Sequence, residues 1–276
     1  MRWRGFAKTV IWIEDRRRAG NNQGRRKVQP MKAVMLAAGM GTRLSGHNDA
    51  HPPKSLLRFG GQSLLARHIV ALKALGIDEL ALVVGYHADA LRAEVAAIGA
   101  GGFVRFLENP QYRRGSMVSL WTAREVLRQG ETLYMDADVL YDPALLDRMM
   151  AFPAPTCFPI DRDFEEGDEP VKLCLRAGRP VEFRKLVGEV AFDTVGEWIG
   201  FIRMAADFAA ELAAATERFV AAGRLDEPCE EAMRAVLLAG TAPVGTEDVT
   251  GIPWIEIDFP EDVARAEWEI LPRIGA

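Results

Sequence analysis

Between residues 32 and 136, short apolar runs alternate with stretches of helical periodicity, and this alternation constrains the fold more than any other feature. The apolar runs predict buried strands at 32–38, 79–84, 103–107 and 132–135. Apolar residues recur at helical spacing in the three segments between them, 63–75, 88–98 and 116–128. Strands that alternate with helices favour a mostly parallel sheet flanked by helices, so we predict an α/β, Rossmann-like fold.

The second half of the chain has a less regular pattern. Its apolar segments predict strands, some of them antiparallel, at 156–160, 171–175, 180–185, 198–204 and 254–258. Further helices are expected at 205–222, at 230–238 and from Pro260 onward. Without an internal repeat or a low-complexity linker, we expect residues 31–276 to form one domain, with a substrate-binding lid region around 155–204. Residues 1–30 are expected to be a disordered or non-native extension.

The charge and cysteine patterns argue against several classes of protein. Residues 1–30 hold nine Lys/Arg and two Asp/Glu, which leaves +7 there and, from −5 overall, −12 for residues 31–276. Such an acidic body disfavours a nucleic-acid partner, because phosphate backbones bind basic surfaces. Cys157, Cys174 and Cys229 show neither a disulfide framework nor metal-ligand spacing. No apolar run approaches the roughly 20 residues of a membrane helix, so we expect a cytoplasmic protein without a membrane partner; the sequence leaves a homodimer open.

A glycine-rich loop follows the first predicted strand. It reads Leu36-Ala-Ala-Gly-Met-Gly-Thr-Arg-Leu44, with Pro53-Lys54 shortly after it. Small residues let backbone N–H groups approach a triphosphate, while Arg43 and Lys54 supply positive charge for a departing pyrophosphate. The loop lacks the third glycine of a dinucleotide fingerprint, which argues against an oxidoreductase. It also lacks the Gly-Lys-Ser/Thr ending of a P-loop. The alternative is an ordinary strand-to-helix turn with solvated Arg43 and Lys54.

An acidic pair, Asp136-Ala-Asp138, ends the fourth predicted strand. Loops that follow parallel strands share one edge of the sheet, so the acidic pair and the glycine loop should meet there. Residues two apart on a strand face the same side, and both carboxylates are therefore expected to point into one crevice. Carboxylate oxygens are ligands that Mg²⁺ prefers, so the pair is a candidate magnesium site.

Together, the glycine loop and Pro53-Lys54 resemble the signature of the sugar-phosphate nucleotidyltransferase superfamily, over residues 32 to about 270. The resemblance implies a glycosyltransferase-A-like fold whose loop wraps the base and phosphates of an NTP, with Arg43 and Lys54 as catalytic residues. It also implies that Mg²⁺ is bound by Asp138, with Asp136 beside it. The second metal carboxylate would be Asp258, in the late strand Trp254-Ile-Glu-Ile-Asp258. The alternative for Asp258 is a cap on the helix that follows.

Several segments are most similar to small cytidylyltransferases that act on phosphocholine, aminoethylphosphonate and related alcohol phosphates. These segments are 83–86, 109–112, 119–121, 196–201 and 254–258. The resemblance implies transfer of CMP from CTP to a small phosphorylated or phosphonate substrate, with release of pyrophosphate. The chain departs from its relatives at Gly115-Ser116-Met117-Val118, where they often have paired asparagines.

We expect two groups of ligand-binding residues. The nucleotide-binding group is Leu36, Ala37, Ala38, Gly39, Met40, Gly41, Thr42, Tyr86, Glu108 and Ser116. The substrate-binding group is Tyr112, Lys185, Glu197 and Trp198. Lys185 would lie near a phosphate, and Tyr112 or Trp198 would hold a quaternary ammonium by cation–π attraction, unless these aromatic rings only pack in the core or at its rim. The acidic stretch 161–169 would attract a cationic head group or form a solvated loop.

Two other functions stay open on the same scaffold. One is a nucleotidyltransferase for a sugar 1-phosphate or inositol phosphate, and the other is a catalytically inactive nucleotide-binding regulatory protein. The joint presence of Arg43, Lys54, Asp138 and Asp258 argues against the inactive protein, because a pure binder needs no pair of metal carboxylates. Because an acceptor phosphate is largely ionised at neutral pH, the reaction needs positioning and charge stabilisation rather than a general base.

Overall fold

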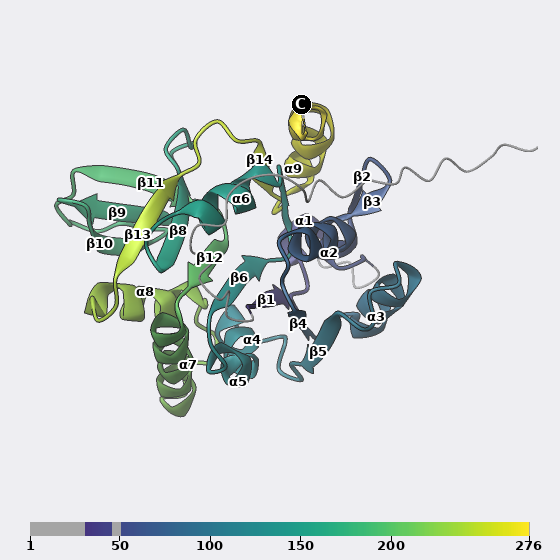
Figure 1. The fold of residues 1–276 in the computed structure, drawn as a ribbon, viewed down its shortest axis with the longest axis horizontal. Helices are drawn as coiled ribbons and strands as arrows, with labels where there is room; N and C mark the ends of the chain where they lie inside the picture. The colour runs from purple at the N-terminus through teal and green to yellow at the C-terminus, as the bar shows by residue number, and fades with distance from the viewer. Residues whose placement is uncertain (1–30, 46–50, 276) are drawn as a thin grey trace, which may run out of the picture.

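The computed structural model describes residues 31–45 and 51–275, and a ten-stranded sheet runs through them with helices packed on its two faces (Figure 1). The strand order is β10-β9-β11-β8-β12-β6-β1-β4-β5, and β13 pairs with β8 outside this path. The strands of this sheet are β1 (Lys32–Ala37), β4 (Glu79–Val84), β5 (Val104–Glu108), β6 (Thr132–Asp136), β8 (Thr156–Asp161), β9 (Lys172–Arg176), β10 (Arg179–Arg184), β11 (Thr194–Trp198), β12 (Phe201–Met204) and β13 (Val244–Asp248).

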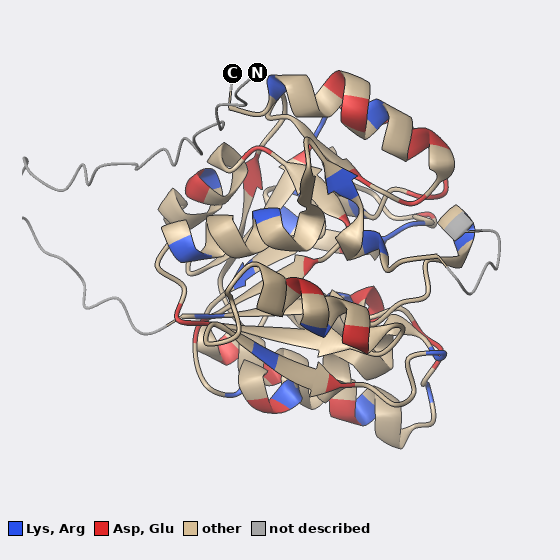
Figure 2. Ribbon diagram, turned by 90° about the vertical axis from the view of Figure 1, so that its right-hand side faces the viewer, with Lys and Arg blue, Asp and Glu red and all other residues tan. Residues whose placement is uncertain are grey.

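The helices and two small two-stranded sheets complete the fold. The helices are α1 (Thr42–Ser45), α2 (Leu64–Ala74), α3 (Ala88–Ala97), α4 (Ser116–Thr122), α5 (Arg124–Leu127), α6 (Ala144–Ala151), α7 (Ala206–Ala221), α8 (Glu230–Ala239) and α9 (Pro260–Arg265). The small sheets pair β2 (Arg58–Phe59) with β3 (Gln62–Ser63), and β7 (Val139–Tyr141) with β14 (Trp254–Glu256). In the view of Figure 2, acidic and basic residues are interspersed along the outer helices.

The two halves of the sheet differ in strand direction. β1 pairs in parallel with β4 and β6, and β4 pairs in parallel with β5, so the carboxyl ends of these strands lie at one edge. β12, β8, β11, β9 and β10 form antiparallel pairs. The predicted α/β class with a mixed sheet flanked by helices is confirmed, and the parallel pairs lie mainly among the strands of the first half. Residues 155–204 supply β8 to β12 of the sheet, and their role as a substrate lid stays a prediction.

The sheet is covered by a hydrophobic cluster on each face. Along β1, Val34 joins the cluster beneath α4, α7 and α8, whereas Ala33 and Met35 join the cluster beneath α2, α3 and α6. Successive side chains of a strand point to opposite faces, so a strand covered on both sides must be apolar throughout. This explains why the apolar runs of the first half predicted their strands well.

The structure corrects several predicted boundaries. The helix expected at 116–128 is divided into α4 and α5 at Ala123. The strand expected at 198–204 is two strands, β11 and β12, because Gly200 between them has φ of +85°. β7, α6 and β13 were not predicted. The expectation for residues 1–30 lies outside the described residues. Among the residues that are described, no helix has the length and apolar character to cross a membrane.

Candidate active site

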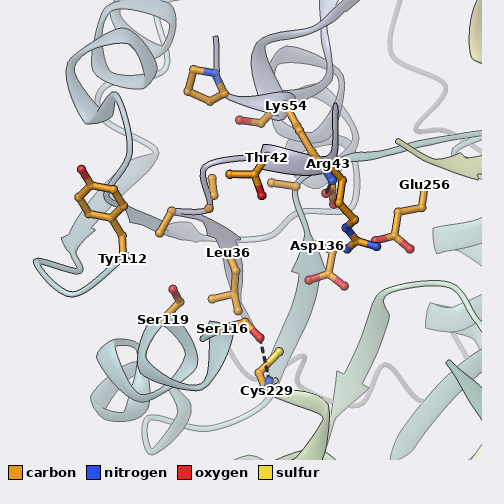
Figure 3. Close-up of a pocket in the computed structure, with 18 of the residues that line it drawn as sticks. Leu36, Thr42, Arg43, Lys54, Tyr112, Ser116, Ser119, Asp136, Cys229 and Glu256 are labelled. Carbon is orange, nitrogen blue, oxygen red and sulfur yellow. Dashed lines mark hydrogen bonds and ion pairs between the residues drawn. The ribbon is translucent and has the colours of Figure 1, made fainter. Parts of the chain in front are cut away.

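A cleft of about 300 Å³ opens at the edge of the sheet where β1 and β6 end (Figure 3). The glycine loop after β1 forms one wall, and Asp136 and Asp138 lie where β6 ends and the chain turns into β7. Glu256, at the end of β14, comes in from the C-terminal part of the chain. The predicted meeting of the glycine loop with the acidic segments is thus what the structure shows.

Three carboxylates come together beside this cleft. One oxygen each of Asp138, Glu256 and Asp258 lies within 4.8 Å of the others. The pairing of β14 with β7 brings them together, and the Ile257 N–H donates to the Asp138 carbonyl oxygen at 3.0 Å. Ile255 and Ile257 point into a hydrophobic cluster, which leaves Glu256 and Asp258 on the side of the cleft.

Lys54 and Arg43 place two positive charges against these carboxylates. The Lys54 ammonium donates to Asp138 Oδ2 at 3.0 Å and to Asp258 Oδ1 at 2.5 Å. Arg43 Nη1 lies 3.0 Å from Asp258 Oδ2 and 2.5 Å from Glu169 Oε2. Burial alone would lower the pKa of Lys54, but the charges on Asp138 and Asp258 outweigh it and raise the pKa above its ordinary value. Both cations are therefore charged at neutral pH.

The carboxylate group fits a magnesium ion by its chemistry. Mg²⁺ prefers hard oxygen donors, usually one or two carboxylates together with phosphate oxygens and waters, and the group supplies enough carboxylates for this. Asp258 is not the helix cap of the alternative interpretation, because the Asp262 carboxylate accepts from the backbone N–H groups of Asp258 and Phe259 at the start of α9. The exposed carboxylate of Glu256 lies beside the negative charges of Asp138 and Asp258, which repel it. A cation would relieve this repulsion.

Asp136, which we expected among the metal ligands, lies outside this group. β6 ends at Asp136, so Asp138 belongs to a turn and the same-face argument for a continuous strand does not apply. The Asp136 carboxylate accepts a hydrogen bond from the Tyr134 hydroxyl at 2.7 Å. Burial, followed by the charge on Asp138, raises the pKa of Asp136 well above its usual value. Asp136 thus lines the cleft without belonging to the group of three carboxylates.

Most of the expected nucleotide-binding residues line the cleft, and three do not. The residues that line it are Leu36, Ala37, Ala38, Gly39, Gly41, Thr42 and Ser116. Met40 Sδ accepts a hydrogen bond from Arg113. Tyr86 is buried, and its hydroxyl donates to the His51 carbonyl oxygen. Glu108 forms an ion pair with Arg92 on the surface.

Gly41 fits its position in the loop for a steric reason. Its φ is +62°, a conformation that favours glycine, and a Cβ there would lie 3.2 Å from Cγ of Lys54. The small residue thus lets the loop pass directly over the lysine that reaches the carboxylates.

The four expected acceptor residues do not share one pocket. Tyr112 lines the cleft and packs so closely on Gly85 that a Cβ there would lie 2.4 Å from the tyrosine Cβ. Lys185 donates to Glu169 at 2.8 Å, outside the cleft. Trp198 is only 4% exposed, and its indole N–H donates to the Phe201 carbonyl, so the structure supports the core-packing alternative for this ring.

Glu197 lies in a neighbouring acidic cleft of about 390 Å³, which also contains Glu256 and Asp258. Burial, and then the charge of Asp161 across the β11–β8 pair, raise the pKa of Glu197 to about 7. Phe164, Trp254 and residues of the 161–169 stretch line this second cleft. The acidic stretch is thus part of a hollow that adjoins the carboxylate group.

Sequence reasoning missed several residues of the site. Glu169 bridges Arg43 and Lys185, and nothing in the pattern of the acidic stretch marked it out. Cys229 lies on the floor of the cleft, where its backbone N–H donates to Ser116 Oγ at 2.8 Å (Figure 3). Glu256 was visible in the alternation of the late strand, since it shares a face with Asp258, and that signal was not used.

The matching family model is the MobA-like NTP transferase domain, over residues 33–195. This match covers more than half of the chain, so the chain belongs to the MobA-like NTP transferase domain family. Among curated proteins, it is 29% identical to CMP-5'-(3-aminopropyl)phosphonate synthase of Streptomyces rubellomurinus over 254 residues, 88% of this chain and 39% of that protein. It is 28% identical to a bifunctional IPC transferase and DIPP synthase of Rubrobacter xylanophilus over 242 residues, 87% of this chain and 52% of that protein. The chain thus spans only part of these relatives, 39% of the first and about half, 52%, of the second.

Solved structures show the same fold. The inositol-1-phosphate CTP transferase from T. maritima superposes with a TM-score of 0.71 at 20% identity, covering 89% of this chain and 96% of that one. The CTP:phosphocholine cytidylyltransferase from Streptococcus pneumoniae superposes with a TM-score of 0.68 at 20% identity, covering 87% and 98%. The predicted nucleotidyltransferase fold is therefore confirmed.

Proposed function

We propose that the protein is a Mg²⁺-dependent nucleotidyltransferase that transfers CMP from CTP to a small phosphorylated or phosphonate alcohol or amine and releases pyrophosphate. The observation that carries this proposal is the group of three carboxylates with Lys54 and Arg43 beside the glycine-loop cleft. Nucleotidyl transfer needs carboxylates that bind a divalent cation and positively charged side chains that bind the phosphates. Both kinds of group lie together in this site. Membership in a family of NTP transferase domains supports the same reaction class.

The choice of CTP and of the acceptor class is supported by the relatives. Those named above include a CMP-aminopropylphosphonate synthase and, among solved structures, a CTP:phosphocholine cytidylyltransferase. A 2-aminoethylphosphonate cytidylyltransferase of Lancefieldella rimae is 30% identical over 109 residues, 39% of this chain and 43% of that protein. Three relatives thus join CMP to a phosphate or phosphonate that carries an amine or ammonium group.

In the proposed reaction, an acceptor oxygen bonds to the α-phosphorus of CTP, and the bond from that phosphorus to the oxygen shared with the β-phosphate breaks. The backbone of the glycine loop holds the phosphates by its N–H groups. Arg43 stabilises the charge that develops on the leaving pyrophosphate, and Lys54 lies beside the α-phosphate or the incoming oxygen. Asp138 and Asp258 would hold Mg²⁺, joined by Glu256; when bound, the ion neutralises charge on the phosphate oxygens. Of the four expected acceptor residues, Tyr112 lines this cleft, and it would contact the acceptor there.

A second candidate function is transfer to an inositol phosphate or sugar 1-phosphate. It is favoured by the similarity to the IPC transferase and DIPP synthase and by the fold of the inositol-1-phosphate CTP transferase. The third candidate, an inactive nucleotide-binding regulatory protein, would bind CTP without releasing pyrophosphate.

Pyrophosphate release from a panel of nucleotides and acceptors separates these functions. The purified protein is mixed with Mg²⁺ and each of CTP, UTP, GTP, ATP and dTTP, together with phosphocholine, aminoethylphosphonate, aminopropylphosphonate, inositol 1-phosphate or a sugar 1-phosphate. We expect release with CTP and an amine-bearing acceptor. Release only with inositol or sugar phosphates would support the second function, and CTP binding without release under every condition would refute nucleotidyl transfer.

A further inference from the structure

The ammonium of Lys54 occupies the space between two of the proposed metal ligands. It lies 3.0 Å from Asp138 Oδ2 and 2.5 Å from Asp258 Oδ1, and its side chain is only 14% exposed. The other oxygen of Asp258 lies 3.0 Å from Arg43 Nη1. Both oxygens of Asp258 and one of Asp138 are therefore already engaged by positive charges of the chain itself.

A divalent cation would have to displace this internal cation. Ligation of Mg²⁺ at Asp258 would use an oxygen that already pairs with Lys54 or Arg43, and at Asp138 the oxygen that faces Asp258 across Lys54 is engaged in the same way. A metal held a few ångströms from a positively charged lysine would also experience strong repulsion, and at about 4 Å in a partly buried site this repulsion is large compared with thermal energy.

The phosphates of a nucleotide offer Lys54 and Arg43 an alternative partner. Both basic side chains originate at the walls of the cleft, and the glycine loop passes over Lys54 at Gly41. A triphosphate bound by this loop presents several negative oxygens to the two cations. Once Lys54 turns to the phosphates, the oxygens of Asp138 and Asp258 become free for a metal.

We propose that Lys54 acts as an internal counter-cation that excludes divalent metal from the nucleotide-free protein, so that metal enters the carboxylate group only with, or after, the phosphates. The proposal rests on the proposed function for the identity of the phosphate ligand, but the exclusion itself concerns the free protein. Binding linkage is reciprocal. Because Lys54 weakens metal binding while it bridges Asp138 and Asp258, a bound metal in turn favours the conformation in which Lys54 has turned away from them.

Mn²⁺ binding to the free protein tests this exclusion without any catalytic readout. Mn²⁺ is titrated into wild type and Lys54→Gln without nucleotide, and free Mn²⁺ is measured by electron paramagnetic resonance. We expect Lys54→Gln to bind one Mn²⁺ about 5- to 150-fold more tightly than wild type. Lys54→Arg keeps the positive charge and should bind as weakly as wild type.

Two further variants control the experiment. Lys32→Gln removes a lysine that pairs with Glu79 at the opposite end of β1, and it should bind Mn²⁺ as wild type does. The double variant Lys54→Gln/Asp258→Asn should lose the gain, because one of the ligands is removed. Equal Mn²⁺ affinity in wild type and Lys54→Gln, or no binding to either, overturns the proposal.

A second measurement uses wild type alone, in case Lys54→Gln does not fold. Crystals of the nucleotide-free protein are soaked in MnCl₂ and examined for anomalous density between Asp138 and Asp258. We expect the Lys54 ammonium there and no manganese peak, and a manganese peak would overturn the proposal. Neither measurement depends on turnover, so failure of the proposed nucleotidyl transfer and failure of metal exclusion are distinguishable.

Discussion

Replacing Glu197 with Gln should stabilise the protein, and more so at higher pH. Glu197 lies on β11 opposite Asp161 of β8, where burial and the Asp161 charge raise its pKa from 4.5 to about 7. At pH below 4.5, the carboxyl is protonated in both folded and unfolded chains, so its ionisation does not change the free energy of unfolding. Between pH 4.5 and 7 the unfolded chain ionises first, and the free energy of unfolding falls; above pH 7 the loss is complete.

The size of the effect follows from the two pKa values. The interval from 4.5 to about 7 corresponds to about 3 kcal/mol of unfolding free energy, and most of it accrues between pH 5 and pH 8. Because Glu197 is only partly buried, solvent screening reduces this to about 2 kcal/mol. Glu197→Gln removes the titration, so its stability relative to wild type should rise by about 2 kcal/mol from pH 5 to pH 8.

Urea unfolding of wild type and Glu197→Gln at pH 5 and pH 8, followed by tryptophan fluorescence, measures this difference. Glu211→Gln, which changes an exposed glutamate on α7, is the matched control and should show the pH dependence of wild type. A stability difference between wild type and Glu197→Gln that stays constant from pH 5 to pH 8 would refute the reasoning about this carboxyl.

Three other substitutions test the site and its supports. His68 is fully buried, and burial lowers its pKa from 6.5 to about 4, so folding opposes its ionisation, and the contribution of His68 to stability should fall by about 2 kcal/mol between pH 7.5 and pH 5. In urea unfolding, His68→Phe should lack this pH-dependent contribution to the free energy of unfolding. The same pH dependence in wild type and His68→Phe would contradict the assignment to His68. Gly200→Ala forces a Cβ to within 2.8 Å of Asp136 Oδ2 at φ of +85°, and should cost about 1–3 kcal/mol, seen as a lower Tm. Lys54→Ala should lower the rate of pyrophosphate release about 100- to 1000-fold while the circular dichroism spectrum stays unchanged; a wild-type rate would contradict its assignment.

The first half of the fold was predictable because β1, β4 and β6 are buried on both faces and its helices carry a regular apolar stripe. The second half was harder for a physical reason. Most of its strands pair antiparallel, and a single residue such as Gly200 divides what looks like one apolar run into two strands. β13 inserts beside β8 from far along the chain, and no local pattern predicts that pairing.

The site was partly predictable for a related reason. The glycine loop and Asp138 follow parallel strands, so topology alone places them at the same edge. Asp258 is 204 residues from Lys54 in sequence, and only the resemblance to a known family joined them. Trp198 was misplaced as an acceptor residue because the sequence does not say which face of β11 is covered, and helices and β12 bury that side.

The central claim is that Asp138 and Asp258 hold a metal ion against the phosphates of a nucleotide bound by the glycine loop. A crystal structure of the protein with CTP and Mg²⁺, without an acceptor, tests it most directly. We predict one Mg²⁺ bound to oxygens of both carboxylates and of the triphosphate, with the Lys54 ammonium moved onto a phosphate. Well-ordered CTP with no cation between Asp138 and Asp258, and with Lys54 still bridging them, would contradict the account.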